Sequence, residues 1–290
     1  MDVAMEPRVV EARHFIDAEV ETPFGVMSIT RDQWPSPIDR TNRPLTHHLQ
    51  LSLLPHWESG AGCFTDHWGP SRFEPIGRTF LTPSGQNLRV RSECREQQAI
   101  VYRFNDQILE RWFEDGIDWT NGRLEGSLDI GDGEIRQQLI RMGAELRSPG
   151  FASDTVLELL AAHTVVNLVR YLRGIDRCEA SGGLSPWRLR RIDEYLAEHP
   201  AKVSLCDLAG VCDLSVRQLT RAFRTSKGRS IGDYIASQRI ERAKALLLSG
   251  RVVKSVAQEL GFSSPSNFSA AFLRATGERP RTYRQSAARR

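Results

Sequence analysis

Two segments near the end of this 290-residue chain repeat one local pattern, and the repeat constrains the fold more than any other feature. The first segment covers residues 204–223 and the second covers residues 253–272. Each predicts a short helix, a tight turn and a second helix that carries a phenylalanine at its inner end. Two such units in succession predict an all-α domain with tandem helix-turn-helix motifs.

The turn of each unit has the same order of residue types. An alanine, Ala209 or Ala257, allows the two helices to approach closely. Four residues later stands a residue that tolerates left-handed backbone, Asp213 or Gly261. We therefore expect the first helix of each unit to end at these two positions.

The second helices begin with recognisable caps. Ser215 with Gln218 three residues later predicts a capping box, and Ser264 before Pro265 predicts an N-cap with proline at the first helical position. A helix predicted over residues 230–249 joins the units and would span about 30 Å. Since one turn of B-DNA is about 34 Å, such a helix would hold two DNA-contacting helix-turn-helix units about one turn of the duplex apart.

The residues that match a known family extend from Trp187 to Arg284. They are Leu208, Ala209, Leu214, Ser215, Leu219, Arg221, Phe223, Gly228, Tyr234, Ile235, Arg239, Ala243, Leu247, Ala257, Gly261, Phe262, Phe268, Phe272, Gly277, Pro280, Tyr283 and Arg284. With these residues the region resembles the DNA-binding domain of the AraC/XylS family of bacterial transcription regulators. In that family the second helix of each unit enters the major groove of DNA. The resemblance implies DNA contacts from Arg217, Gln218, Thr220, Arg221, Ser266, Asn267 and Arg274.

The second unit departs from the family pattern. The family commonly has a basic residue where this chain has Ala270 and a lysine where it has Leu273, although Arg274 remains. Arginine to guanine is the commonest specific base contact. We therefore expect the first unit to discriminate sequence and the second to position the protein on the DNA backbone.

Charge is divided between the two parts of the chain. Residues 187–290 hold 20 basic and 9 acidic side chains, a balance of +11, whereas residues 1–186 have a balance of −8. This asymmetry favours a nucleic-acid-binding module attached to a separate domain. A helical bundle without DNA function is the alternative, but it explains neither the charge division nor the repeat.

The first part of the chain predicts strands over residues 14–120 and helices over residues 134–173. The fold class is therefore α+β: an N-terminal cupin-like β-barrel with a helical dimerisation segment, followed by the all-α tandem helix-turn-helix domain. The expected boundaries are an effector-binding and dimerisation domain over 1–174, a flexible linker over 175–186 and a DNA-binding domain over 187–290. The barrel rests on strand content and on the domain that often precedes the reader in the family.

Candidate effector contacts are aromatic side chains that could form walls and arginines that could bind an anion. They are Trp57, Trp68, Phe80, Arg89, Arg91 and Arg95. Arg91 and Arg95 have the Arg-x-x-x-Arg spacing of PilZ-type cyclic-di-GMP binders, but the companion motif of that class is absent from the sequence. Exposed strand arginines without a ligand remain the alternative.

No enzyme signature accompanies the strands. The histidines at 47, 48, 56 and 67 lack the His-x-His pair of metal-dependent cupins, and no nucleophile elbow or phosphate-binding glycine loop occurs. We therefore expect no catalytic residues, no metal and no cofactor. A cupin-type enzyme with a helical interaction tail is the alternative that these absences disfavour.

The predicted function is an effector-responsive transcription regulator, with activation as the commoner outcome in the family. Expected partners are double-stranded promoter DNA, RNA polymerase, a small-molecule effector and a second copy of the chain. No run of 18 apolar residues occurs and the five cysteines form no paired spacing, so a cytoplasmic protein without a membrane span is expected. A constitutive regulator whose barrel only dimerises is the alternative.

Overall fold

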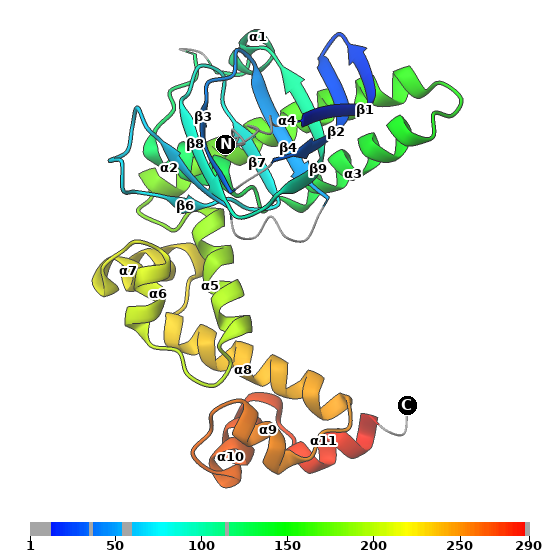
Figure 1. Cartoon of the computed structure of the whole chain (residues 1–290). Coiled ribbons are helices and arrows are strands. Elements are labelled where there is room, and N and C mark those ends of the chain that lie inside the picture. The colour runs from blue at the N-terminus through cyan, green and yellow to red at the C-terminus, as the bar shows by residue number, and fades with distance from the viewer. Residues whose placement is uncertain (1–12, 35–36, 54–59, 114–115, 288–290) are drawn as a thin grey trace, which may run out of the picture. The chain divides into compact units, whose positions relative to one another are not determined.

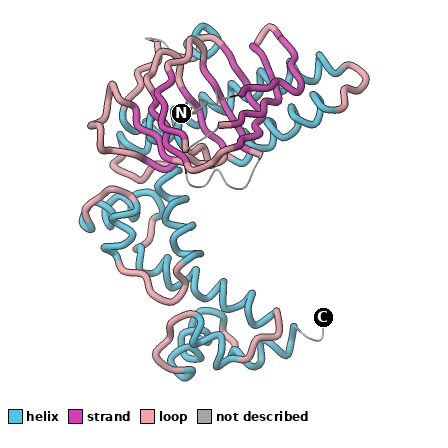
Figure 2. Tube along the Cα trace, viewed as in Figure 1, coloured by secondary structure: helices cyan, strands magenta, loops and turns pink. Residues whose placement is uncertain are grey.

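The computed structural model describes residues 13–34, 37–53, 60–113 and 116–287 (Figure 1). The chain divides into two compact units, Met1–Arg177 and Cys178–Arg290. Strands occur in the first unit and helices make up the second, as the secondary-structure colouring of Figure 2 shows. The combination of a sheet-rich region with a helical C-terminal domain confirms the α+β class.

Antiparallel strands form two sheets among the described residues of the first unit. A 5-stranded sheet has the order β1-β2-β9-β4-β7, and a 4-stranded sheet has the order β3-β8-β5-β6. The strand bounds are β1 Arg13–Thr22, β2 Gly25–Gln33, β3 Ile38–Asn42, β4 His47–Ser52, β5 Ala61–Phe64, β6 Glu74–Pro75, β7 Thr79–Thr82, β8 Leu88–Ser92 and β9 Glu96–Phe104. No ladder between described strands joins the two sheets into a closed barrel. The sheet-rich region is thus confirmed, and the cupin-like barrel is not.

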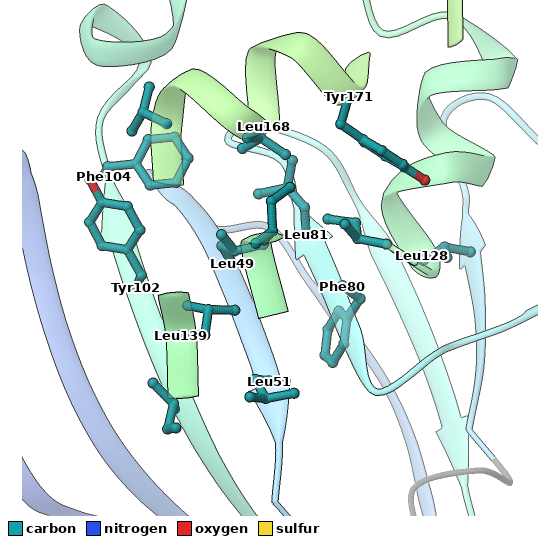
Figure 3. Packing of buried hydrophobic residues seen from close by; sticks show 14 of the residues in the cluster. Leu49, Leu51, Phe80, Leu81, Tyr102, Phe104, Leu128, Leu139, Leu168 and Tyr171 are labelled. Atoms are coloured by element: carbon teal, nitrogen blue, oxygen red, sulfur yellow. The ribbon is translucent and has the colours of Figure 1, made fainter. Parts of the chain in front are cut away.

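Helices cover one face of the 5-stranded sheet. They are α2 Asn121–Leu128, α3 Gly133–Arg147 and α4 Ser153–Ala180, and the short α1 Asp106–Glu110 follows β9. Figure 3 shows Leu49 and Tyr102 of the sheet meeting Leu139 of α3 and Leu168 of α4. α3 lies so close to β9 that a Cβ added to Gly143 would be 2.3 Å from the Ile100 Cδ1 atom. Apolar side chains of sheet and helices therefore share one core.

The helical segment is longer than the sequence pattern predicts. α4 continues to Ala180, whereas a flexible linker was expected from residue 175. Ile175 is fully buried in the core of the first unit, and Asp176 accepts two hydrogen bonds from the Arg123 guanidinium at 2.8 and 2.6 Å. These tertiary contacts keep residues 175–180 helical. The predicted linker is wrong over that stretch.

α4 is also the one described helix that could span a membrane by length and composition. The segment Ser153–Cys178 has a mean hydropathy of 1.2, and 56% of its most apolar window is buried inside the protein. Its apolar residues Leu157, Leu168 and Leu172 belong to the core that the helix shares with the sheet. This burial is the property of a core helix.

The second unit consists of helices with two separate cores. Their bounds are α5 Pro186–Glu198, α6 Leu205–Val211, α7 Val216–Lys227, α8 Ile231–Leu248, α9 Val253–Glu259, α10 Pro265–Thr276 and α11 Pro280–Ala287. α8 contributes Ile231 and Tyr234 to one core and Ile240, Ala243 and Leu247 to the other. One helix therefore joins two helix-turn-helix units, α6-α7 and α9-α10, as predicted.

Candidate nucleic-acid interface

The turns of the two units have matching geometry. Asp213 and Gly261 both adopt left-handed backbone, with φ of 51° and 72°. The amide of Leu214 donates to the Ala209 carbonyl at 2.9 Å, and the amide of Phe262 donates to the Ala257 carbonyl at the same distance. Both alanines are buried. The predicted closure of each turn is confirmed.

The caps fix where the second helices begin. The Ser215 hydroxyl accepts from the Gln218 amide at 3.3 Å, and the Gln218 Oε1 atom accepts from the Ser215 amide at 2.9 Å. In the second unit the Ser264 hydroxyl accepts from the Asn267 amide at 3.1 Å. The Asn267 side-chain amide donates to the hydroxyl of Ser263 at 2.7 Å. Gln218 and Asn267, both predicted DNA contacts, therefore also hold their helix starts.

The outer face of α7 carries a row of arginines. Arg217, Thr220, Arg221 and Arg224 are exposed and, with Val216 and Thr225, line one shallow groove. Their spacing of three and four residues places them on one side of the helix. Within the described part of the chain, no carboxylate pairs with Arg217, Arg221 or Arg224. The face therefore offers guanidinium groups to an anionic partner.

Arg224 and Thr225 belong to this face but were missed by the sequence reasoning. Arg224 follows Arg221 by three residues and Arg217 by seven, so helical periodicity alone would have found it. The contacts that the family resemblance implies lie in the first turns of the helix and do not include these two residues.

The corresponding face of α10 is short of cations. α7 and α10 can be aligned by their ends. The N-caps Ser215 and Ser264 are 49 residues apart, and so are the C-caps Gly228 and Gly277. At that offset the arginines of α7 at 217, 221 and 224 correspond to Ser266, Ala270 and Leu273 of α10. Arg274, exposed, corresponds to Thr225. The exposed face of α10 therefore carries fewer cations than the exposed face of α7, as the sequence predicts.

The candidate effector aromatics of the first unit lie in its core. Trp68 is 6% exposed, contacts Phe64 edge-to-face and donates from Nε1 to the Asn121 Oδ1 atom at 3.1 Å. Phe80 is 4% exposed and packs in the same core (Figure 3). Trp57 lies outside the described residues. Neither described aromatic presents an open wall to solvent.

Two of the three candidate effector arginines contact one carboxylate of the protein itself. Arg89 donates from Nε and Nη2 to the two carboxylate oxygens of Asp39 at 2.6 and 2.8 Å, and Arg91 Nε donates to the same carboxylate at 3.2 Å. The hydrogen bond from Arg89 holds the pKa of Asp39 below its ordinary value. Arg95 is exposed beyond the end of β8. An anionic ligand at Arg89 and Arg91 would have to compete with Asp39.

The histidines weighed as metal ligands are arranged differently from a metal site. Across the described ranges, no three His, Cys, Asp or Glu side chains gather around a point. His47 is buried against Phe104 and Trp119, and its Nδ1 atom accepts from the Ser84 amide at 3.0 Å. Burial lowers the pKa of His47 to about 4. His47 is therefore a neutral core residue at physiological pH, and His56 lies outside the described residues.

A known protein-family model matches the chain within its second compact unit, Cys178–Arg290. A family model described as a helix-turn-helix domain matches residues 208–286. The chain is 35% identical over 183 residues to the probable transcriptional regulator LumQ of Photobacterium leiognathi, covering 62% of this chain and 71% of LumQ. It is 34% identical over 100 residues to the regulator RipA of Corynebacterium glutamicum, covering 34% of this chain and 30% of RipA. It is 28% identical over 157 residues to the activator RhaR of Cronobacter sakazakii, covering 52% of this chain and 54% of RhaR.

Two solved structures are similar in sequence to part of the chain. The DNA-binding domain of AdpA in complex with a target DNA is 28% identical, covers 36% of this chain and 95% of that chain, and has a TM-score of 0.33. A regulator from Chromobacterium violaceum described as having an AraC-type DNA-binding domain is 27% identical, covers 35% and 92%, and has a TM-score of 0.33. The relatives named here are transcription regulators and not enzymes.

Proposed function

The chain belongs to the AraC/XylS family of DNA-binding transcription regulators, and on that premise we propose that it is an effector-responsive activator that binds promoter DNA as a homodimer in the cytoplasm. The finer parts of this function are the effector, the sign of regulation, the dimer and the compartment.

The observation that carries the proposal is the arginine face of α7. Arg217, Arg221 and Arg224 are exposed on a helix whose start is fixed by a capping box and whose turn is closed. In the major groove their guanidinium groups would donate to guanine O6 and N7, and each good contact contributes about 1–3 kcal/mol of discrimination. Ser266, Asn267 and Arg274 of α10 would contact the phosphate backbone of the DNA about one turn of the duplex away.

Regulation would pass from the first unit to the second by a population shift. An effector bound in the first unit would favour one of two arrangements of the units or of the dimer, and only its difference in affinity for the two could drive the change. Exposed apolar side chains on and next to α3 and α4 support the dimer: Ile140 is 45% exposed, Leu159 is 66% exposed and Phe151 is fully exposed. The RhaR relatives named as activators support activation, which would require contact with RNA polymerase.

A second candidate function has its own support in the first unit. Trp68 and Phe80 are buried in the core, and Arg89 and Arg91 already contact Asp39. These residues therefore have structural roles that need no ligand. A constitutive regulator, whose first unit only dimerises, agrees with this arrangement.

The DNA-binding part is tested by titrating the full-length protein against a selected duplex and a scrambled duplex over a range of salt concentrations. Affinity for both should fall steeply with salt, by about 0.9 in log K per unit of log salt for every phosphate contacted. Only the selected duplex should lose tenfold or more with Arg221→Ala, by the contribution of a guanine contact of about 1.4 kcal/mol. Arg136→Ala, an exposed arginine of α3, is the matched control and should change neither affinity. Equal binding of the two duplexes by the unchanged protein would contradict the proposal.

The two candidate functions differ in their response to small molecules. The effector-responsive activator predicts that some members of a panel of small anionic and aromatic compounds raise the thermal midpoint of the first unit and change transcription from a reporter promoter. A constitutive regulator predicts the same reporter output with every compound and no thermal shift. Occupancy at one hundred times the dissociation constant would stabilise the unit by about 2.7 kcal/mol, which a melting curve resolves.

A further inference from the structure

The turn between α9 and α10, in the second helix-turn-helix unit, contacts the loop between α5 and α6, which leads into the first helix-turn-helix unit. The proposed roles of α7 and α10 in DNA binding do not explain this contact. Gly261 has φ of +72°, and a Cβ added there would lie 2.0 Å from the carbonyl oxygen of Ala201 and 2.7 Å from its carbonyl carbon. Ala201 lies in the loop between α5 and α6. Real Cβ atoms do not approach backbone this closely, so only glycine can stand at 261 while the loop stays in place.

Left-handed backbone is only part of the reason for this glycine. Asp213 occupies the equivalent turn position in the first unit with φ of 51°, and its side chain is exposed. An aspartate therefore satisfies the turn itself at a modest conformational cost. What distinguishes position 261 is the Ala201 loop seated against it.

Two arginines of α8 hold the same loop and the helix before it. Arg239 Nη2 donates to the Ala201 carbonyl at 3.4 Å, and Arg242 Nη1 donates to the Ala197 carbonyl at 2.7 Å. Ala197 lies in the last turn of α5, where carbonyls lack partners within the helix and a cation is favoured. α8 thus contacts α5 and the loop after it through Arg239 and Arg242. These arginines lie beside Ile240 and Ala243, the α8 residues that belong to the core of the second helix-turn-helix unit.

A cavity lies beside these polar contacts. It has a volume of about 280 Å³ and is lined by Pro200 and Val203 of the loop, by Arg239 and Arg242 of α8, and by Leu260, the C-cap of α9. The joint between the two helix-turn-helix units therefore consists of a backbone contact and arginine hydrogen bonds. A joint of this kind resists rotation of one unit against the other.

We propose that Gly261, Ala201 and Arg239 form a spacer clamp that fixes the angular phase between α7 and α10, and so determines which half-site spacing the protein accepts on DNA. The inference rests on the proposed roles of α7 and α10 as DNA-contacting helices. α8, with 18 residues, sets a separation of about 27 Å along its axis. The phase matters as much as the distance, because each base pair rotates the contacted face by roughly 34°.

The test uses the full-length protein and a duplex that it selects from a random library. Derivatives of that duplex move the second half-site by one, two or three base pairs in either direction. The unchanged protein should prefer the selected spacing by about tenfold, which is the contribution of a few positioned contacts. Gly261→Ala should reduce this preference to about threefold or less, because the Cβ displaces the loop and the phase is no longer held.

Gly277→Ala is the matched control. Gly277 also has left-handed backbone, with φ of +77°, but no atom lies within 4 Å of an added Cβ. The substitution therefore imposes backbone strain on the same unit without touching the clamp, and it should keep the tenfold spacing preference. Arg239→Gln, which loses the charged donor without altering a turn, should flatten the preference as Gly261→Ala does.

Two outcomes would overturn the clamp. One is an unchanged spacing preference in Gly261→Ala and Arg239→Gln. The other is a loss of all dependence on the base sequence of the second half-site, since that result means that the second unit has unfolded and not rotated. Failure of the proposed function looks different: the unchanged protein would then show no dependence on either half-site.

Discussion

Single side chains on α7 carry the inequality between the two units. Arg217, Arg221 and Arg224 are exposed there, whereas the equivalent positions of α10 hold serine, alanine and leucine. An exposed guanidinium contributes little to folding, since surface charges interact weakly through water. The residues that we propose to discriminate DNA sequence can therefore be changed without changing the fold.

Arg221→Ala should reduce discrimination between the selected and scrambled duplexes, whereas Asn267→Ala should weaken binding only mildly. The expected losses are about tenfold or more for the arginine and under about threefold for the asparagine, because Asn267 already bonds to Ser263. Competition titrations measure both, and a circular-dichroism melt serves as the folding control. Equal losses from the two substitutions would contradict the division of roles.

His47 should make the first unit less stable in mild acid. Burial lowers the pKa of His47 to about 4 in the folded state from an ordinary value of 6.5. The unfolded state therefore binds the extra proton between pH 6.5 and 4, so the free energy of unfolding falls as pH falls through that window. The fall should reach about 1.4 kcal/mol per pH unit for one proton.

Urea unfolding between pH 7 and pH 4.5 measures this slope. His47→Asn keeps an acceptor near the Ser84 amide but cannot be protonated, so the slope should decrease by about one proton. The slope will not vanish, because burial also lowers the pKa of His48 to about 4. An unchanged slope in His47→Asn would show that His47 does not titrate in this window.

At the scale of elements, local signals place the helices of the second unit. The predicted caps at Ser215 and Ser264, the turns at Asp213 and Gly261 and the long helix between them all occur as expected. Each of these features depends on residues within four positions of one another. Gln218 shows that one side chain serves both the element and its surface, since its oxygen closes the capping box.

Gln218→Glu separates these two roles. Glutamate retains the oxygen that accepts from the Ser215 amide and suits the first turn of a helix, so the free energy of unfolding should change by less than about 0.5 kcal/mol. Affinity for DNA should nevertheless fall, because a negative charge then faces the phosphates beside Arg221. Thermal melts and DNA titrations of the same preparation measure the two effects. A loss of stability with unchanged affinity would assign Gln218 to the cap alone.

At the scale of the whole molecule, a basic unit is attached to an acidic one, and apolar side chains remain exposed on the helices of the first. Leu159 projects from α4 with 66% of its surface exposed. Ile140 and Phe151, on and next to α3, are exposed as well, and exposed apolar side chains that gather can mark a surface that a partner covers. We proposed above that the partner is a second copy of the chain.

Leu159→Glu should convert the dimer into a monomer, because a charge placed in a packed apolar contact leaves an unpaired buried group. Leu45→Glu is the matched control, since Leu45 is 93% exposed and belongs to the loop between β3 and β4. Sedimentation velocity of the full-length protein at micromolar concentration distinguishes the two states. A dimer that persists in Leu159→Glu, or dissociates equally in Leu45→Glu, would place the interface elsewhere.

Local sequence signals specify the doubled helix-turn-helix, its caps, its connecting helix and the different number of arginines on α7 and α10. These features arise from hydrogen bonds and periodicities that span a few residues. Tertiary structure alone decided that the strands form two sheets and that α4 runs to Ala180. It also buried Trp68 and Phe80 in the core.

Long-range pairing explains the remaining differences. Asp39 lies 50 residues before Arg89, and Ala201 lies 60 residues before Gly261, yet each pair is in contact. No local pattern marks an aspartate as the partner of a distant arginine, or a turn glycine as the seat of a distant loop. Such contacts depend on which surfaces meet when the chain packs, and packing is a property of the whole fold.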